Sequence, residues 1–249
     1  GLFSSYRFRG IDQTFGKPAL QGGFDYAHES GFYAGNWNSN VSSGAGFPDG
    51  NLEMDFYAGY KTAVGPIALD VGTLLYYYPG SEGKVLGTNA KSGAVKNHEI
   101  YLGATWEFLT LKYSQSVSDY FSLRGWDNTG ASTGQSTKGT GYLDLSAAYD
   151  LGDGWGVNAH MGHLNLKNGY KGSYTDWKVG VTKDLSGWVV GAAVVGTNAA
   201  GSCSASATDY QFYCFTNSNS ATAAGGLNLG SKTKDSGANT VVLSVSKTF

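Results

Sequence analysis

Proline, charge and long apolar runs are all scarce in this sequence. The chain of 249 residues contains only 4 prolines, and charged residues make up 14% of it, against roughly 25% in soluble domains. No apolar run approaches the roughly 18 residues of a membrane-spanning helix, and no helical periodicity is sustained. The longest apolar runs, "TLLYYY" and "WVVGAAVVG", have the length of strands. These shortages argue against a helical protein, whether soluble or embedded in a membrane.

A signal peptide is also missing, because the chain opens with "GLFSSYRFRG", and we interpret the sequence as mature. A net charge of −2 argues against a nucleic-acid partner. The two cysteines, Cys203 and Cys214, stand in the polar stretch "CSASATDYQFYC" without a further Cys or His at zinc-ligand spacing. An even cysteine count in an exported protein predicts a Cys203–Cys214 disulfide, the alternative being two free thiols in a cytosolic loop.

Glycine and aromatic residues are abundant, with 38 Gly and 17 Tyr, and the mean hydropathy is only −0.23. This composition suits strands that have one apolar and one polar face. Alternation of apolar and polar residues predicts about twelve strands, at 2–9, 19–28, 32–41, 51–61, 67–77, 97–106, 109–118, 141–151, 155–165, 173–183, 187–197 and 239–249.

The connections between these segments alternate between short turns and long loops, the longest near 78–96, 119–140 and 198–238. This rhythm is typical of an antiparallel up-and-down β-barrel of the outer-membrane type, with tight periplasmic turns and long external loops. Strands of about 10 residues, tilted by about 40°, span on the order of 25 Å. We therefore expect a single transmembrane barrel domain over 1–249, and an even strand count predicts that both termini are periplasmic.

Residue parity separates the two faces of the predicted strands. The apolar parity includes Leu20, Phe24, Val71, Leu143 and Tyr149, and we expect it to face lipid. The other parity carries nearly all charges within the strands, as expected for a lumen, because a charge facing lipid costs several kcal/mol at the midplane. The candidate pore-lining residues are Arg7, Arg9, Asp25, Glu53, Asp55, Asp70, Glu99, Lys112, Asp144, Asp176 and Lys178.

The last strand, "TVVLSVSKTF", alternates in the same way and ends on Phe249. We expect it to close the barrel against the first strand, with Phe249 in an interfacial girdle of aromatic residues. A terminal aromatic residue after Val241, Leu243 and Val245 fits the pattern that the outer-membrane assembly machinery recognises. Lys247 departs from that pattern, although a lysine near the interface can snorkel.

Residues 4–41, "SSYRFRGIDQTFGKPALQGGFDYAHESGFYAGNWNSNV", carry a more specific signal. They resemble the opening of the TorF-type porin family of proteobacterial outer-membrane proteins. The matching residues are Tyr6, Arg9, Gly10 and Ile11, then Pro18, Ala19, Gln21 and Gly22, then Ser30, Gly31, Phe32, Tyr33, Gly35 and Trp37. The resemblance implies an exported barrel with a pore, and it implies no catalytic residues and no particular substrate.

Catalytic and metal-binding alternatives find little support. Glu53 and Asp55 share a strand face about 7 Å apart by strand rise, which is compatible with the paired acids of an outer-membrane protease, but pore-lining carboxylates explain them better. His160 and His163 in "HMGH" fall on opposite faces of a strand, which makes a poor metal site. We therefore predict no enzyme activity, no cofactor and no metal.

The predicted function is that of an outer-membrane channel for passive diffusion of small hydrophilic solutes or ions. The alternative is a non-conducting barrel whose external loops contact a partner, and the length of loop 198–238 motivates it. The expected surroundings are membrane lipid and lipopolysaccharide.

Two local expectations complete the sequence-based picture. Arg7 and Arg9 share the inner face of the first strand, where they either pair with carboxylates such as Asp25 or Glu53 or form a strip that attracts anions. We expect the aromatic residues around Cys214 to form a compact lobe, which either folds over or into the pore mouth or belongs to a cross-linked surface loop without a gating role; they are Tyr210, Phe212, Tyr213 and Phe215.

Overall fold

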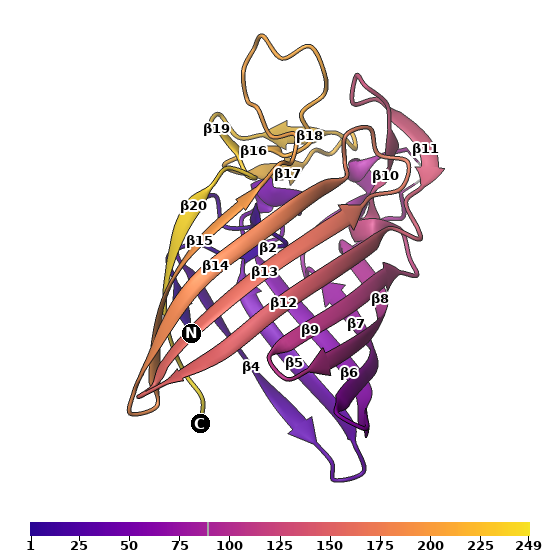
Figure 1. The fold of residues 1–249 in the computed structure, drawn as a ribbon. Coiled ribbons are helices and arrows are strands. Elements are labelled where there is room, and N and C mark those ends of the chain that lie inside the picture. Colours follow the sequence, from indigo (N-terminus) through magenta and orange to yellow (C-terminus); the bar gives the residue numbers. More distant parts are fainter. Residues whose placement is uncertain (89) are drawn as a thin grey trace.

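The computed structural model describes residues 1–249 except residue 89, and it is a closed antiparallel β-barrel of twelve strands (Figure 1). The strands of the wall are β1 (Leu2–Phe3), β4 (Ala19–Ala27), β5 (Phe32–Asn40), β6 (Leu52–Val64), β7 (Ile67–Tyr77), β8 (Lys96–Trp106), β9 (Leu109–Ser116), β12 (Gly141–Gly152), β13 (Trp155–Asn165), β14 (Tyr174–Leu185), β15 (Trp188–Thr197) and β20 (Thr240–Lys247). Each pairs with its neighbour in chain order, and β1 closes the wall between β20 and β4. The predicted all-β up-and-down barrel is confirmed.

The connections lie at two different ends of the barrel, as the sequence predicted. Tight turns gather at the bottom of Figure 1, which we call the turn end, and the long connections gather at the top, which we call the loop end. The loop-end connections contain β10 (Arg124–Trp126), β11 (Ser132–Ser136), β16 (Cys214–Thr216), β17 (Asn219–Ala221), β18 (Leu227–Leu229), β19 (Thr233–Asp235) and the 3-10 turns η1 (Ser43–Ala45), η2 (Gly83–Leu86) and η3 (Tyr120–Ser122). No helix in the described part of the chain is long and apolar enough to cross a membrane.

The turn between β14 and β15 illustrates how sequence sets the tight connections. Leu185 pairs with Trp188, which leaves Ser186 and Gly187 as a two-residue loop with φ of 57° and 88°. Two consecutive positive φ angles define a type I′ turn, whose twist matches that of the flanking strands. Glycine at the second position makes this conformation accessible without a steric penalty.

The outer face of the wall is apolar and exposed. Leu20 and Phe24 are 71% and 72% exposed, and Val71, Leu143 and Tyr149 are about half exposed. These residues belong to the parity that the sequence assigned to lipid. An exposed apolar wall of this extent is what a hydrocarbon environment covers in a transmembrane barrel.

The buried core lies inside the loop half of the barrel rather than between layers. It consists largely of aromatic side chains from the loop ends of strands and from the loops, among them Tyr76, Tyr78, Phe121, Trp126 and Tyr213. Phe47 stacks on Tyr78 with ring centroids 3.8 Å apart. The loop half of the lumen is therefore packed like the interior of a soluble domain.

The predicted strand at 2–9 is wrong beyond Phe3. Eleven of the twelve predicted ranges agree with wall strands to within three residues at either end, but the first wall strand is only Leu2–Phe3. The chain then turns into the lumen, where β2 (Arg7–Phe8) and β3 (Ile11–Asp12) pair as a short hairpin. Residues 5–14, which we call the luminal hairpin, thus lie inside the barrel and not in its wall.

Candidate functional site

The luminal hairpin reverses direction at Arg9 and Gly10, which have φ of 48° and 78°. Phe8 pairs with Ile11 across this two-residue turn. A Cβ atom on Gly10 would lie 2.4 Å from Thr197 Cγ2 and 2.8 Å from Asp176 Cβ. Gly10 is therefore required twice, for its positive φ and because the hairpin tip rests directly on the wall formed by β14 and β15.

Arg9 fastens the hairpin tip to the opposite side of the lumen. Its Nη2 donates to Glu99 Oε2 of β8 at 2.8 Å, and the two side chains are 7% and 2% exposed. The guanidinium also lies 4.2 Å from the ring centroid of Tyr142, and the Arg9 carbonyl accepts a hydrogen bond from Tyr174. Removing one partner of so deeply buried a pair leaves an uncompensated charge, which costs about 3–5 kcal/mol.

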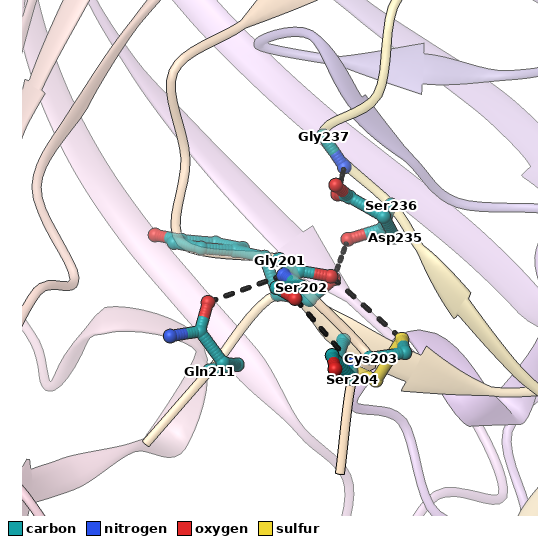
Figure 2. Close-up of a disulfide and its surroundings, with 10 residues drawn as sticks. Gly201, Ser202, Cys203, Ser204, Gln211, Asp235, Ser236 and Gly237 are labelled. Atoms are coloured by element: carbon teal, nitrogen blue, oxygen red, sulfur yellow. Dashed lines mark hydrogen bonds between the residues drawn. A yellow bond between two sulfur atoms is a disulfide. The ribbon is translucent and has the colours of Figure 1, made fainter. Parts of the chain in front are cut away.

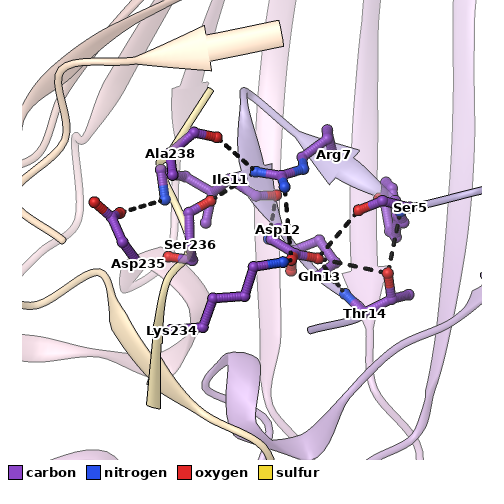
Figure 3. Close-up of polar contacts among 12 residues, drawn as sticks. Ser5, Arg7, Ile11, Asp12, Gln13, Thr14, Lys234, Asp235, Ser236 and Ala238 are labelled. Atoms are coloured by element: carbon purple, nitrogen blue, oxygen red, sulfur yellow. Dashed lines mark hydrogen bonds and ion pairs between the residues drawn. The ribbon is translucent and has the colours of Figure 1, made fainter. Parts of the chain in front are cut away.

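Asp12 connects the luminal hairpin to the loop between β15 and β20 (Figure 3). Its carboxylate is 1% exposed; it accepts from Lys234 Nζ at 2.7 Å and lies 3.7 Å from Arg7 Nη2. Arg7 in turn donates to the carbonyl of Ser236 at 2.9 Å. The backbone N–H of Thr14 also donates to Asp12, at 3.0 Å. The hairpin and the β15–β20 loop are thus held together by a charged, hydrogen-bonded node.

Aromatic contacts complete the seating of the hairpin. Tyr6 donates to Glu53 Oε1 at 2.9 Å and meets Trp37 edge-on, with ring centroids 5.4 Å apart. Phe8 contacts Tyr76 and Phe121 in the same geometry, at 5.4 and 5.7 Å. Edge-to-face pairs of this kind add about 0.5–1.5 kcal/mol each beyond the area that they bury.

Two of the predicted pore-lining residues are therefore misplaced by the sequence analysis. Arg7 and Arg9 do not share a face of a wall strand, and they pair with Asp12 and Glu99 rather than with Asp25 or Glu53. The error has a physical cause, because an alternating segment can pair with itself inside a lumen as well as with the wall.

On the other side of the hairpin tip, His160 lies between two carboxylates from neighbouring strands. Its Nδ1 is 2.6 Å from Asp144 Oδ2, and its Nε2 is 2.6 Å from Asp176 Oδ1. Tyr142 donates to the second oxygen of Asp176 at 2.9 Å. His160 was not among the predicted pore-lining residues, although its strand parity, opposite to that of Met161, assigns it to the inner face.

A polar cavity of about 300 Å³ lies beside this cluster. Its lining combines both signs of charge, namely Arg7, Arg9, Asp144, His160, Asp176 and Lys178, with Gly10, Tyr142, Ser146 and Val195. Five predicted pore-lining residues meet in this one cavity. Groups of both signs around this space can hydrogen-bond to a small polar solute in either orientation.

The remaining predicted residues lie closer to the turn end, or against the hairpin base, in separate small networks. Asp25 accepts from Tyr57 at 2.5 Å, and Asp70 accepts from Tyr33 at 2.6 Å. Lys112 lies 3.7 Å from the ring centroid of Tyr101. These contacts leave the inner wall of the turn half lined by hydroxyl and charged groups.

Glu53 and Asp55, which the sequence places on one face of a strand, both point inward and are 1% and 7% exposed. Glu53 Oε1 accepts from Tyr6, and the carboxyl group of Glu53 also contacts that of Asp55 and the hydroxyl of Tyr78. Two neighbouring acids buried together next to the hairpin base are stable only when such contacts satisfy them.

The predicted disulfide is present and stabilises the β15–β20 loop (Figure 2). Cys203 and Cys214 are joined with an S–S distance of 2.05 Å and a Cα–Cα distance of 5.3 Å. Cys214 begins β16, which pairs with β19 and so with the segment that contains Lys234. The aromatic lobe also forms, because Phe212 stacks on Trp126 with centroids 4.3 Å apart and Tyr213 meets Tyr174 edge-on at 5.0 Å.

The fold and the lumen define a class of protein, a closed twelve-stranded antiparallel β-barrel with an apolar outer face and a charged interior. Among solved structures, a porin described as "NanC porin structure in rhombohedral crystal form" is similar over 100% of this chain and 98% of its own, with a TM-score of 0.57 and 9% identity. An anion-selective porin from Comamonas acidovorans matches over 92% of this chain and 58% of its own, with a TM-score of 0.40 and 13% identity.

The family assignment rests on sequence. A family model described as "Bacterial protein of unknown function (Gcw_chp)" matches residues 1–249, and the chain belongs to this family. No curated protein sequence matches the chain. The resemblance of residues 4–41 to TorF-type porins stays a prediction beside this assignment.

Proposed function

We propose that this protein is an outer-membrane channel for passive diffusion of small hydrophilic solutes or ions, and that the luminal hairpin forms its constriction. The observation that carries the proposal is the polar cavity of about 300 Å³ between the hairpin and the wall, lined by charges of both signs. Outside, the exposed apolar face suits membrane lipid and lipopolysaccharide. Inside, the wall at the turn end offers hydroxyl and charged groups to water.

In this proposal the loop half sets the resistance of the channel. The hairpin and the aromatic core occupy the lumen there, so conduction depends on the space beside the hairpin or on its displacement. A channel of twelve strands is already narrow compared with porins of 16–18 strands. We therefore expect a small unitary conductance and exclusion of bulky solutes. The charged groups serve to bind and guide solutes and carry no catalytic chemistry.

The test is single-channel recording with a shortened hairpin. Tyr6 and Gln13 are hydrogen-bonded across the hairpin, with the Gln13 N–H donating to the Tyr6 carbonyl at 2.9 Å. Replacing residues 7–12 by Asn-Gly therefore closes the chain with a two-residue turn and removes both arginines and Phe8 from the lumen. We expect unitary conductance to rise several-fold.

A matched control shortens a hairpin outside the lumen. Ala221 pairs with Leu227, so replacing residues 222–226 by Asn-Gly shortens the exposed loop between β17 and β18. This variant should conduct like the wild type. If neither the wild type nor the shortened luminal hairpin conducts when correctly folded, the channel proposal fails.

A second function follows from the closed loop end. The β15–β20 loop contains two small sheets and a disulfide. Its Leu229 and Tyr210 side chains are 60% and 37% exposed. A structured and partly apolar loop surface fits a barrel that binds a partner and does not conduct. Two results together would favour this alternative: the wild-type barrel does not conduct, and deletion of the β15–β20 loop abolishes its binding to a partner.

A further inference from the structure

A second cavity, of about 370 Å³, lies within the loop half, between the luminal hairpin and the β15–β20 loop. It is separate in character from the charged cavity, because its lining is mainly aromatic and aliphatic, including Phe8, Ile11, Phe47, Phe121 and Phe215. Its volume falls in the range of about 300–1,000 Å³ that small-molecule sites occupy. Leu229, which is 60% exposed, belongs to the same lining, so the cavity reaches the surface at β18.

One polar group in this lining lacks a partner. Asn219 is 8% exposed, and its Oδ1 has no hydrogen-bond partner. Its backbone is fixed on both sides, because its N–H donates to Ser43 Oγ at 3.2 Å and its carbonyl accepts from the N–H of Asp49 at 3.3 Å. The backbone of Asn219 is thus fixed beside the cavity, and an unpaired buried side-chain carbonyl costs about 1–3 kcal/mol.

Water that enters from the surface finds few hydrogen-bond partners along this mainly apolar lining. A buried water molecule needs about 2–4 polar partners, whereas apolar cavities stay dry and accept apolar molecules instead. A ligand that fills the apolar volume and donates one hydrogen bond to Asn219 would satisfy both features. We propose that the cavity between the luminal hairpin and β17–β18 binds a compact, mainly aromatic molecule that carries a single hydroxyl donor, of the phenol or naphthol type.

The isoleucines provide a built-in reporter for this proposal. The sequence contains only three, Ile11, Ile67 and Ile100. Ile11 lines the cavity and is 4% exposed, whereas Ile67 and Ile100 are 40% and 49% exposed on the wall. Labelling the isoleucine δ1 methyl groups of the full-length barrel in nanodiscs therefore gives one signal in the site and two signals that report partition of a probe into lipid.

The probes are 1-naphthol and naphthalene, which differ by the hydroxyl group. We expect 1-naphthol to shift the Ile11 methyl signal saturably, while the Ile67 and Ile100 signals change only in proportion to probe concentration. Naphthalene should saturate the same signal at roughly tenfold higher concentration, which corresponds to about 1.4 kcal/mol. Equal saturation by both probes, or no saturable shift at Ile11, would overturn the proposal.

The side-chain oxygen is tested by Asn219→Leu, which is similar in shape and has no acceptor. This variant should bind both probes equally, with naphthalene affinity retained, and retained naphthalene binding also demonstrates that the site is folded. The matched control is Asn228→Leu in the neighbouring strand, an exposed position that should keep the preference for 1-naphthol. Loss of both probes in Asn219→Leu alone would show that Asn219 only holds the loop, and would refute its role as the acceptor.

Discussion

The loop half and the turn half of the lumen are built from the same alternating strands and are filled in opposite ways. In the loop half, aromatic residues from strands and loops pack around the luminal hairpin and bury Glu99 and Asp12 to within 2% exposure. In the turn half, Asp25 is exposed and Asp70 is partly exposed, and both bond to tyrosine hydroxyls. The wall strands alone therefore do not decide whether a barrel is open. Side-chain size and an inserted segment decide it.

The difference has an energetic consequence. A buried ion pair surrounded by aromatic side chains is expensive to break, whereas a polar contact that water can replace contributes little. The luminal hairpin should therefore be held firmly in the loop half, and substitutions in the turn half should affect stability much less.

The largest effect is expected from separating Arg9 and Glu99. Arg9→Ala or Glu99→Ala alone should lower the free energy of unfolding by about 3–5 kcal/mol, because each leaves a buried, uncompensated charge. The double variant should lose much less than the sum of the two. Urea unfolding of the barrel, followed by tryptophan fluorescence, measures these differences.

The turn half supplies the matched control for this pair. Tyr57→Phe removes the hydroxyl that bonds to Asp25 and should cost about 1 kcal/mol or less. Additive losses at Arg9 and Glu99, no larger than the loss at Tyr57, would show that the two halves of the lumen are held equally firmly.

The disulfide should have the next largest effect. Replacing Cys203 and Cys214 by serine releases a cross-link between residues separated by 11 positions, worth about 3 kcal/mol in the chain-entropy model. We expect faster proteolysis within residues 203–209 and higher conductance, since this loop holds the luminal hairpin through Lys234 and Ser236. Faster proteolysis at unchanged conductance would show that the disulfide stabilises only its own loop and does not hold the luminal hairpin.

A pair of glycine substitutions measures how much the contact between the hairpin tip and the wall contributes to stability. Gly10 and Gly80 have φ of 78° and 77°, but a Cβ atom on Gly80 would meet nothing within 4 Å, whereas one on Gly10 would clash with Thr197 and Asp176. Both substitutions to Ala carry the backbone cost of about 1 kcal/mol or more. Gly10→Ala should cost about 1–3 kcal/mol beyond that, measured by the same unfolding assay, and equal losses would mean that the tip does not rest on the wall.

The wall of the barrel was predictable from sequence, and the luminal hairpin was not. Apolar and polar residues alternate along a strand because successive side chains point to opposite faces of the wall. This alternation therefore located the wall strands and the charged residues that face the lumen. The same alternation in "SSYRFRG" carries no information on whether the partner is the wall or the segment itself. The Arg9–Gly10 turn, flanked by Phe8 and Ile11, was the local sign of a hairpin.

The His160 cluster shows a second limit. Asp144, His160 and Asp176 come from three neighbouring strands, where Ser146 and Lys178 are the residues directly opposite His160. The carboxylates reach the imidazole from diagonal positions, and parity alone does not give the register between strands. The disulfide, in contrast, needed only the even cysteine count and the expectation that the protein is exported.

The smallest effect is expected at an ion pair on the outside of the loop end, between Lys171 and Asp209. Lys171 Nζ donates to Asp209 Oδ2 at 2.5 Å, but both groups lie at the exposed surface, where water and salt screen them. The hydrogen bond from Lys171 lowers the pKa of Asp209, and the bond from Lys171 to Asp209 raises the pKa of Lys171. A lowered carboxyl pKa gives a contribution that is present above the ordinary carboxyl pKa and is lost as the pH falls through the lowered value. The raised pKa of Lys171 gives a contribution that is lost only at high pH, as the pH rises through that raised value.

Asp209→Asn should therefore loosen the loop slightly at neutral pH and change nothing at a pH well below the lowered pKa of Asp209. Hydrogen exchange at the amides of Tyr170 and Tyr210, whose N–H groups donate to Trp126 and Asn128, measures this locally. If Asp209→Asn lowered the free energy of unfolding as much as Arg9→Ala does, exposed and buried ion pairs at the loop end would contribute equally. The packing of the lumen around Arg9 would then make no difference to the strength of its ion pair.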